Sequence, residues 1–417
     1  MITLLLALCT LQSDPTQVDP IEAPPPEPVE VREPGVLPGP TERWYRGNTH
    51  THTLWSDGNA APEAVASFYV EHDYDFLVLS DHNILSEGER WMPVEPEGRL
   101  RPEHVADLRE RFGPVDVREV AGRQEMRLRT LVELRERFET PGEFTFITGE
   151  EITDAFEGKP VHVNGVNLAE LIEPQGGDSL RDTLNRNVDA VAEQSKRTDQ
   201  PMLAHVNHPN FDWGLSWEDI AHVVNDRFFE VYNGHSAVRN EGDAEHPGME
   251  ELWDRANTLR LTELDLPLLY GVATDDSHDY HGWGPGHTNP GRGWVMVAAA
   301  ALEADALVTA MRAGRFYSST GVTLERVETT GGRYLVEHAP EEQVVFTTRF
   351  LGTRRDAAGE LQIGVVLHET HEPVAVYEFT GDELFVRAVV VSSRLHPNPY
   401  QVGDLEMAWT QPVPGNR

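Results

Sequence analysis

Short apolar runs that end in histidine or acidic residues recur along this chain, and no other feature of the sequence restricts its fold as strongly. Such runs stand at residues 75–83 (DFLVLSDHN), 144–153 (FTFITGEEIT), 201–209 (PMLAHVNHP) and 268–278 (LLYGVATDDSH). Between them lie stretches whose apolar residues recur every three or four positions, which indicates amphipathic helices. Apolar strands that alternate with such helices predict βαβ units and a parallel sheet, so the expected fold class is α/β.

The helices expected between these strands have recognisable starts and apolar faces. One begins at Pro62 and carries Val65, Phe68 and Tyr69 on one face. Further helices are expected at residues 180–191, 250–256 and 303–312.

Two segments depart from the alternation of strands and helices. Residues at about 86–141 form an insertion, with helices expected at 102–112 and in a segment that ends near Phe138. An insertion of this length can cover the mouth of a site. After Gly321 the helical pattern stops, and short strands separated by turn residues predict a β-sandwich-like domain over residues 321–417.

The first part of the chain predicts export. Residues 1–12 form a short apolar segment whose length fits a secretion signal better than a membrane span. Residues 13–41 are rich in Pro and Glu, which predicts an extended linker before a folded region that begins near Trp44. We therefore expect a secreted or periplasmic protein, with lipid anchoring through Cys9, the only cysteine, as a further option.

The balance of charges excludes one class of partner. The chain has 70 Asp and Glu against 34 Lys and Arg, a formal net charge of −36. Proteins that bind the nucleic-acid backbone need a basic surface, so nucleic acid is not an expected partner. No internal apolar run reaches the roughly 18 residues of a transmembrane span, and none is expected.

The residues at the strand ends are those of a metal site built without thiolates. In α/β barrels the C-terminal ends of the strands open to one face, so clusters that are distant in sequence converge on one pocket. Two histidines one residue apart on a strand point to the same side, and one carboxylate can bridge two cations. The candidate ligands are His50, His52, Asp57, His82, Glu151, His162, His205, His208, Asp276 and His278.

Each of these pairs taken alone is weak evidence, because His-x-His pairs arise by chance in a chain with 18 histidines. Their ordered recurrence at strand ends is what predicts a metal site. By contrast, His368 and His371 fall in the strand-rich tail and are interpreted as surface residues. His72, His104 and His222 lie on expected helices and are interpreted as surface or core residues.

Together these motifs resemble those of the PHP superfamily, named for polymerase and histidinol phosphatase. THTHTLWSDG resembles its first motif, LSDHN its second, ITGEEIT its third, NHPNF its His-Pro motif and TDDSH its final Asp-x-His. VHVNGVNL, GRFYSSTG and AWTQPV look like the branch that includes bacterial carbaryl hydrolases (CehA/McbA-like proteins). The resemblance implies a metallohydrolase domain over residues 42–320, folded as a distorted TIM-like (β/α)7 barrel with about two or three divalent metal ions (Zn, Mn or Fe).

Carried onto this sequence, the resemblance implies three sets of ligands: His50, His52, Glu151 and Asp276 for one metal; Glu151, His162 and His208 for a second; Asp57, His82 and His278 for a third. His208 precedes the proline as in the family, and His205 is its competitor. Asp57 stands where many phosphatase members of the family have a histidine.

The function that the resemblance favours is metal-dependent hydrolysis, with Glu151, His208 and His278 in the catalytic set. A phosphoesterase also needs a cation for the oxygens of its substrate. Arg292 is the first candidate, and Arg123 and Arg127 are others.

The preferred interpretation is an exported phosphoesterase that acts on a small-molecule ester or phosphoester. A carboxylic or carbamate ester hydrolase of the carbaryl-hydrolase type is the first alternative. A metal-stabilised binding module whose β-rich tail recognises a ligand is the second. For protonation of the leaving group, the sequence offers His235, His281 and His287.

Overall fold

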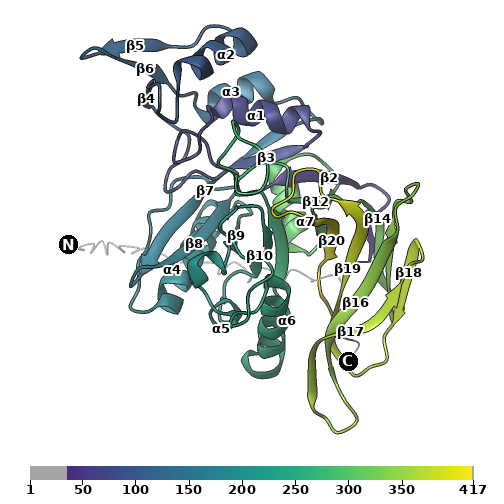
Figure 1. Ribbon diagram of the computed structural model, residues 1–417. Coiled ribbons are helices and arrows are strands. Elements are labelled where there is room, and N and C mark those ends of the chain that lie inside the picture. The colour runs from purple at the N-terminus through teal and green to yellow at the C-terminus, as the bar shows by residue number, and fades with distance from the viewer. Residues whose placement is uncertain (1–34, 416–417) are drawn as a thin grey trace, which may run out of the picture. The chain divides into compact units, whose positions relative to one another are not determined.

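The computed structural model describes residues 35–415 and places most of its strands in one mixed 14-stranded sheet (Figure 1). Across this sheet the strands are β11 (Tyr270–Thr274), β10 (Phe228–Asn233), β9 (Leu203–Val206), β8 (Lys159–Val166), β7 (Thr145–Phe156), β3 (Phe76–Leu79), β2 (Arg43–Asn48), β12 (Trp294–Ala299), β13 (Phe316–Ser319), β20 (Leu405–Thr410), β19 (Glu383–Leu395), β16 (Phe346–Arg355) and β17 (Leu361–Thr370), with β21 (Val413–Pro414) beside β19. The predicted signal segment with Cys9, and the predicted linker as far as residue 34, lie outside the described residues.

Two smaller sheets and the helices complete the fold. A 4-stranded sheet contains β1 (Val36–Leu37), β14 (Leu324–Thr330), β15 (Arg333–His338) and β18 (Val374–Glu378), and a 3-stranded sheet contains β4 (Trp91–Pro93), β6 (Arg123–Arg127) and β5 (Val117–Val120). The helices are α1 (Pro62–Glu71), α2 (Pro102–Phe112), α3 (Leu131–Phe138), α4 (Leu180–Thr198), α5 (Trp217–Ala221), α6 (Met249–Leu259) and α7 (Ala304–Arg312), with a 3₁₀ turn at Phe211–Trp213 and a π-helical turn at Arg260–Leu264.

The helices begin where the sequence indicates. Pro62 and Pro102 stand in the first turns of α1 and α2, where a missing backbone N–H costs nothing. Thr130 caps α3 by accepting a hydrogen bond from the backbone N–H of Glu133, whose side chain accepts one in return. Val65 and Tyr69 of α1 are fully buried, as the apolar spacing predicts.

The predicted parallel sheet is wrong at β8 and also at β12, which is antiparallel to both of its neighbours, β2 and β13. β2, β3 and β7 run parallel, and so do β9, β10 and β11, but β8 is antiparallel to both of its neighbours. Only Glu157 and Gly158 separate β7 from β8, and both have positive φ values (50° and 81°). A two-residue loop of this kind joins antiparallel strands, whereas parallel strands need a long crossover.

The two outer strands of this half of the sheet also meet. An isolated parallel bridge links Thr51, which follows β2, to Ser277, which follows β11. Around it the backbone N–H of His52 donates to the carbonyl of Ser277 over 3.0 Å, and the N–H of Asp276 donates to the carbonyl of His50 over 3.0 Å. The His-x-His and Asp-x-His motifs are therefore fixed side by side by their own backbones.

The β-rich tail continues the large sheet. β20 pairs with β13, with Tyr317 opposite Thr410, so one ladder of strands runs from the metal-ligand half into the tail. Val389 and Trp409 of the tail lie in the same buried cluster as Trp253 of α6. On the other side of the tail, side chains of both sheets share a second buried cluster, which includes Tyr334, Val336, Tyr377, Phe350 and Ala388.

Two features of the fold differ from what the sequence predicted. The insertion has the two expected helices, but also the sheet β4–β6–β5, in which β5 and β6 are short, rich in charged residues and mostly exposed. Strand β1 lies inside the predicted linker, where it pairs with β14, and its residue Leu37 is buried. Folded structure therefore begins before Trp44.

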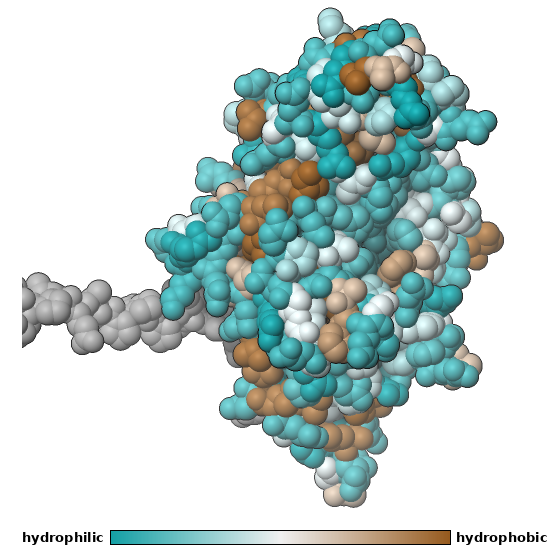
Figure 2. Space-filling model, turned by 90° about the vertical axis from the view of Figure 1, so that its left-hand side faces the viewer, coloured by the Kyte–Doolittle hydropathy of each residue, from teal (hydrophilic) through white to brown (hydrophobic). Residues whose placement is uncertain are grey.

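The surface agrees with the composition. The face shown in Figure 2 is mostly hydrophilic, with hydrophobic side chains in separate patches. None of the helices within residues 35–415 combines the length and the apolar character that a membrane span needs.

Candidate metal centre

The predicted ligands gather at one edge of the large sheet. His50 and His52 follow β2, His82 follows β3, His208 follows β9 and Asp276 follows β11. Since these strands run in the same direction, their C-terminal ends open to the same side. Motifs that are far apart in the sequence are therefore close together in space.

The hairpin of β7 and β8 brings two further ligands to this edge. Glu151 lies in β7, and His162 lies near the start of β8, where it is opposite Thr153. His162 is not at the C-terminal end of a strand, but β8 runs the other way, so its first residues lie at the same edge. Its Nδ1 is 3.0 Å from Glu151 Oε1.

Nitrogen and oxygen acceptors converge between His50 and His52. The Nε2 atoms of the two rings are 3.1 Å apart. Asp276 Oδ1 lies 3.3 Å from His50 Nε2 and 3.2 Å from His52 Nε2. Glu151 Oε1 lies 3.5 Å from His50 Nε2, and its Oε2 lies 3.4 Å from His52 Nε2. All four side chains are buried.

Glu151 is the hub of the cluster. Besides the two histidines above, its carboxylate contacts His162, His82 (Nδ1 to Oε2, 2.8 Å) and His208 (Nε2 to Oε1, 3.3 Å). Asn207 Nδ2 donates to Oε1 over 2.8 Å and orients it. The neighbouring Glu150 points to the other side of the strand, as alternation requires, and accepts from the backbone N–H of Ile172 over 2.7 Å.

His208 and His205 occupy different environments. His208 Nε2 is near both Glu151 Oε1 (3.3 Å) and Asp276 Oδ2 (3.8 Å). His205 is also buried, but the nearest carboxylate is Glu230, 3.9 Å from its Nδ1. Within the described residues, neither ring nitrogen of His205 has a hydrogen-bond partner. The geometry therefore favours His208 over His205 as a ligand.

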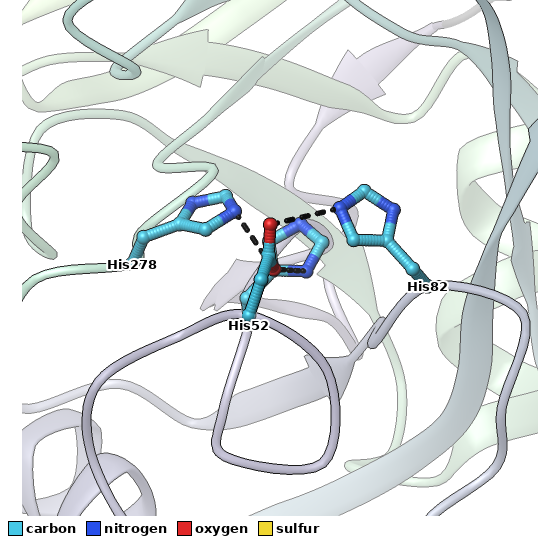
Figure 3. A group of neighbouring side chains, drawn as sticks. His52, His82 and His278 are labelled. Atoms are coloured by element: carbon cyan, nitrogen blue, oxygen red, sulfur yellow. Dashed lines mark ion pairs between the residues drawn. The ribbon is translucent and has the colours of Figure 1, made fainter. Parts of the chain in front are cut away.

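Asp57 stands among three imidazoles (Figure 3). Its carboxylate is 3.2 Å from His278 Nε2, 3.4 Å from His82 Nε2 and 3.6 Å from His52 Nδ1. Its side chain is 55% exposed, so this end of the cluster is open to solvent. Asp81 holds the loop in place, because its buried carboxylate accepts from Thr53 and Ser56.

All the predicted ligands except His205 belong to four overlapping groups whose donor atoms lie within 4.8 Å of one another: His52, Asp57, His82 and His278; His50, His208 and Asp276; His50, His52 and Glu151; His82, Glu151 and His162. These groups share His50, His52, His82 and Glu151, as expected of a centre with more than one cation. Glu151 and Asp276 face imidazole nitrogens that are the usual ligands of Zn, Mn and Fe.

The electrostatics of the cluster show that it is built for positive charge. Burial alone would raise the pKa of Glu151, but the charges of His162, His50 and His82 hold it well below its usual value. Burial would lower the pKa of His50, but Asp276, Glu230 and Glu151 raise it well above its usual value. Burial lowers the pKa of His52 to about 3, and His278 adds to this effect.

These residues fit a bound cation. Glu151 Oε2 is buried and has no properly oriented hydrogen bond within residues 35–415, although two imidazole nitrogens lie close to it. A cation placed among such atoms satisfies lone pairs that a hydrogen bond does not reach, and it takes the place of the protons on the imidazoles.

A residue that the sequence did not single out orients the first ligand. Glu230 of β10 accepts from His50 Nδ1 over 2.6 Å and from Thr274 Oγ1 over 2.8 Å. It also accepts from the backbone N–H of His208 and from Asn233 Nδ2, each over 2.7 Å. With Nδ1 of His50 bound to Glu230, Nε2 faces the cluster. The sequence signal for this role is an acidic residue inside the otherwise mostly apolar segment FFEVYN.

The structure does not bring Arg292 to the cluster. Its buried guanidinium donates to the backbone carbonyls of Gly234 (2.8 Å), His287 (2.6 Å), Gly284 (3.1 Å) and Asn398 (3.3 Å). These hydrogen bonds use the donors of Arg292 to hold two loops together, so few donors remain for a substrate.

The other arginine and histidine candidates differ in whether they lie near the cluster. Arg127 pairs with Asp116 and Glu133 within the insertion. Of the three histidines proposed for the leaving group, His235 has its ring 5.2 Å from that of His278. His281 and His287 line a separate cleft, together with Arg99.

Comparison with known proteins gives only distant likenesses. No protein-family model and no curated protein matches the chain at the level of sequence. A crystal structure of a two-domain protein from Bacteroides vulgatus, with a predicted PHP-like metal-dependent phosphoesterase, is 14% identical with a TM-score of 0.41, over 90% of this chain and 96% of that one.

Two further solved structures are similar over a smaller share of this chain. A candidate metal-dependent phosphoesterase from Bifidobacterium adolescentis is 13% identical with a TM-score of 0.29, over 57% of this chain and 88% of its own. An amidohydrolase from Chromobacterium violaceum, with bound sulfate and no metal, is 11% identical with a TM-score of 0.26, over 56% and 88%. At these values the likenesses carry no argument about the function of this chain.

Proposed function

We propose that this protein is a metal-dependent phosphoesterase of the PHP type, acting on a small-molecule phosphoester. The observation that carries the proposal is the convergence of five imidazoles around Glu151, with Asp276 beside His50 and His52, in the order that the PHP motifs have. Such a set of neutral nitrogen and carboxylate donors is typical of hydrolytic metal centres.

The proposal includes the architecture that goes with the family. Strands β2, β3 and β7 to β11 form a distorted seven-stranded barrel, supported by the Thr51–Ser277 bridge between its first and last strands. Residues 42–320 are the metallohydrolase domain and residues 321–417 a sandwich-like extension, supported by the buried cluster between its two sheets. Membership of the carbaryl-hydrolase branch and export through residues 1–12 belong to the proposal as well.

The proposed ligands are those implied by the motifs. His50, His52, Glu151 and Asp276 hold one cation, Glu151 with His162 and His208 a second, and Asp57, His82 and His278 a third. Bound divalent cations supply water of lowered pKa and positive charge that stabilises the transition state.

The chain itself contributes a hydrogen-bond donor at the open end of the cluster. His235 Nδ1 accepts from the backbone N–H of Ala237 over 3.1 Å, so its proton is on Nε2. Burial lowers the pKa of His235 to about 4 and keeps the ring neutral. A neutral ring with Nε2–H can donate to an oxygen of the substrate, and we assign this role to His235 in place of Arg292, to which we assign a positioning role.

Two adjacent glutamates provide the experiment that tests the metal centre. We expect Glu151→Gln to lose bound metal, measured by inductively coupled plasma mass spectrometry, and with it hydrolysis of p-nitrophenyl phosphate. Glu150→Gln is the matched control, because burial raises the pKa of Glu150 to about 8 and it is already largely uncharged at neutral pH. A metal-loaded, active Glu151→Gln protein would contradict the proposal.

The choice of substrate is decided by a second assay on the same preparations. Wild-type protein is tested with p-nitrophenyl phosphate and p-nitrophenyl acetate, with added Mn or Zn and with chelator. Metal-dependent turnover of the phosphate supports the phosphoesterase. Turnover of the acetate alone would replace it by the carboxylic or carbamate ester hydrolase. Turnover of neither by metal-loaded protein would favour a binding module.

A further inference from the structure

A second group of basic side chains lies next to the metal centre, in a cleft between the insertion and the glycine-rich loop after His278. The cleft has a volume of about 440 Å³, and the basic residues that line it are Arg99, Arg101, His104, His281 and His287. They are concentrated in one place although the chain as a whole has a net charge of −36. Neither the motifs nor the proposed mechanism uses any of them.

Arg99 connects this cleft to the metal centre. Its Nη1 donates to the backbone carbonyls of Ser56 (2.5 Å) and Gly58 (3.2 Å), which flank Asp57. Within the described part of the chain it has no carboxylate within 4.0 Å, and its other nitrogens have no protein acceptor. The guanidinium is thus held beside the proposed third metal position with donors that remain available to a ligand.

Arg101 and two stacked histidines form the opposite wall. Arg101 Nη2 lies 2.7 Å from His104 Nε2, so this nitrogen accepts and the ring is neutral. The ring of His104 stacks on that of His281, with centroids 3.7 Å apart and an angle of 12° between the planes. His281 Nε2 in turn is 3.1 Å from the carbonyl of Asn59, whose backbone N–H donates to the carbonyl of His278 over 2.8 Å.

Two of the three carboxylates at the cleft are already bound by donors of the protein. Asp279 accepts from Asn59 Nδ2 (2.7 Å), from His287 Nδ1 (2.5 Å) and from the backbone N–H groups of His281 and Gly282. Its charge is therefore taken up by donors of the protein. Glu103 pairs with Arg101 Nε over 3.1 Å and His104 accepts from Nη2, which leaves Nη1 of Arg101. Glu97 lies on the exposed rim.

We propose that this cleft is an anion subsite, which holds a second anionic group of the substrate while the phosphoester lies at the metal centre. The inference rests on the proposed function and narrows it to phosphoesters that carry a further phosphate or carboxylate. The guanidinium donors of Arg99 and Arg101 suit either anion, since phosphate and carboxylate oxygens both accept charge-assisted hydrogen bonds.

Steady-state kinetics of Arg101→Gln tests the subsite. The substrates are a sugar bisphosphate against the matching monophosphate, and phosphoglycerate against glycerol phosphate. We expect KM for the two doubly anionic substrates to rise about tenfold, the loss of one charge-assisted hydrogen bond, with kcat and the values for the singly anionic substrates nearly unchanged. The bisphosphate and phosphoglycerate arms distinguish a phosphate from a carboxylate as the preferred group.

Arg109→Gln is the matched control, because Arg109 is an exposed arginine of α2, the helix that begins directly after Arg101, and does not line the cleft. It removes the same charge and should leave all four KM values unchanged. An equal rise in KM for singly and doubly anionic substrates in Arg101→Gln, or the same effect in Arg109→Gln, would overturn the subsite, because general electrostatics would then explain the result.

A titration with inorganic phosphate separates this inference from the proposed function. By calorimetry, the metal-loaded wild type should bind phosphate in two steps, and Arg99→Gln/Arg101→Gln in one, with metal content unchanged by mass spectrometry. If the protein hydrolyses none of the phosphoesters, the proposed function fails, and this titration still decides the subsite. A second step that persists in the double variant would overturn it.

Discussion

At the scale of single residues, replacement of Glu230 tests how the ligands of the metal centre are oriented. Glu230 accepts four hydrogen bonds, including those from His50 Nδ1 and the backbone N–H of His208. In Glu230→Gln an amide N–H₂ group would face one of these donors, and His50 would lose its orientation. We expect metal affinity to fall about 10- to 100-fold, measured by competition with a chromophoric chelator.

The control for this variant is again Glu150→Gln, a change at a buried glutamate that contacts none of the ligands. Unchanged affinity in Glu230→Gln would mean that Nε2 of His50 is held toward the cluster by its backbone alone. The hydrogen bonds around Asn48, which donates to the carbonyl of His50 over 3.1 Å, would then be sufficient.

His396 should make the stability of the protein depend on pH. Burial, followed by the charge of Arg292, lowers the pKa of His396 to about 4, against about 6.5 in the unfolded chain. The unfolded state therefore binds more protons between these values, and stability is complete above pH 6.5 and is lost as the pH falls toward 4. Between pH 7.5 and 5 the loss from this residue is about 2 kcal/mol.

Urea unfolding of wild type and His396→Asn at both pH values measures this contribution. The variant keeps an acceptor for the backbone N–H of Asn398, which His396 Nδ1 binds over 3.0 Å. It should lose less stability than wild type on acidification, by the amount given above. Equal losses would show that His396 is as protonated in the folded state as in the unfolded state.

The site was predictable from sequence as far as residue types and strand ends determine it. His50, His52 and Asp276 come together because they follow the ends of parallel strands, and Glu151 reaches the same edge from within β7. Arg292 shows the limit, since sequence gives the presence of a guanidinium but not the carbonyl groups that surround it. The basic cleft could not be predicted, because Arg101 and His281 meet only through the packing of the insertion against a distant loop.

At the scale of elements, one buried ion pair joins α6 to β19. Arg387 donates from Nε and Nη2 to the two oxygens of Asp254, each over 2.8 Å, and from Nη1 to Glu250 over 2.7 Å. Arg387 and Asp254 are almost fully buried. Arg387→Met leaves a buried carboxylate without a partner, so we expect it to reduce the free energy of unfolding by about 3–5 kcal/mol.

Chemical denaturation of Arg387→Met, Asp254→Leu and the double variant gives the coupling free energy between Arg387 and Asp254. The double variant should recover most of the loss, because two apolar side chains replace the pair without a buried charge. Additive losses would show that α6 and β19 are held together by their apolar contacts and that the pair contributes little.

The elements were predicted well where their signals are local. Helices α2 and α3 end at Phe112 and Phe138 as expected, because proline, threonine caps and apolar spacing act within a few residues. The direction of β8 and the sheet in the insertion were missed. The direction of β8 depends on a two-residue turn after β7. The sheet in the insertion depends on pairing between the charged strands β5 and β6, which leave no apolar pattern to recognise.

At the scale of the whole molecule, the metal-ligand half and the tail should unfold together. β20 pairs with β13, and Gln411 of the tail both donates to and accepts from the backbone of Gly271 in β11, over 2.9 Å each. Loss of the tail would expose these edges and the core around Trp409. We expect a single transition in which far-UV circular dichroism and tryptophan fluorescence coincide.

A protein truncated after residue 320 provides the complementary observation, since it should be insoluble or lack a cooperative transition. Two separated transitions in the full chain, or a stable and active truncated protein, would contradict this prediction. The metal-ligand half would then fold by itself, and residues 321–417 would be an independent domain.

The spread of the ligands along the chain has a consequence for the lifetime of the protein. A cation held by His50, Glu151 and Asp276 would tie together the ends of β2, β7 and β11, which are far apart in sequence. Many proteins obtain such cross-links from disulfides, but this sequence has a single cysteine. Bound metal would therefore also determine how well the folded protein resists proteolysis.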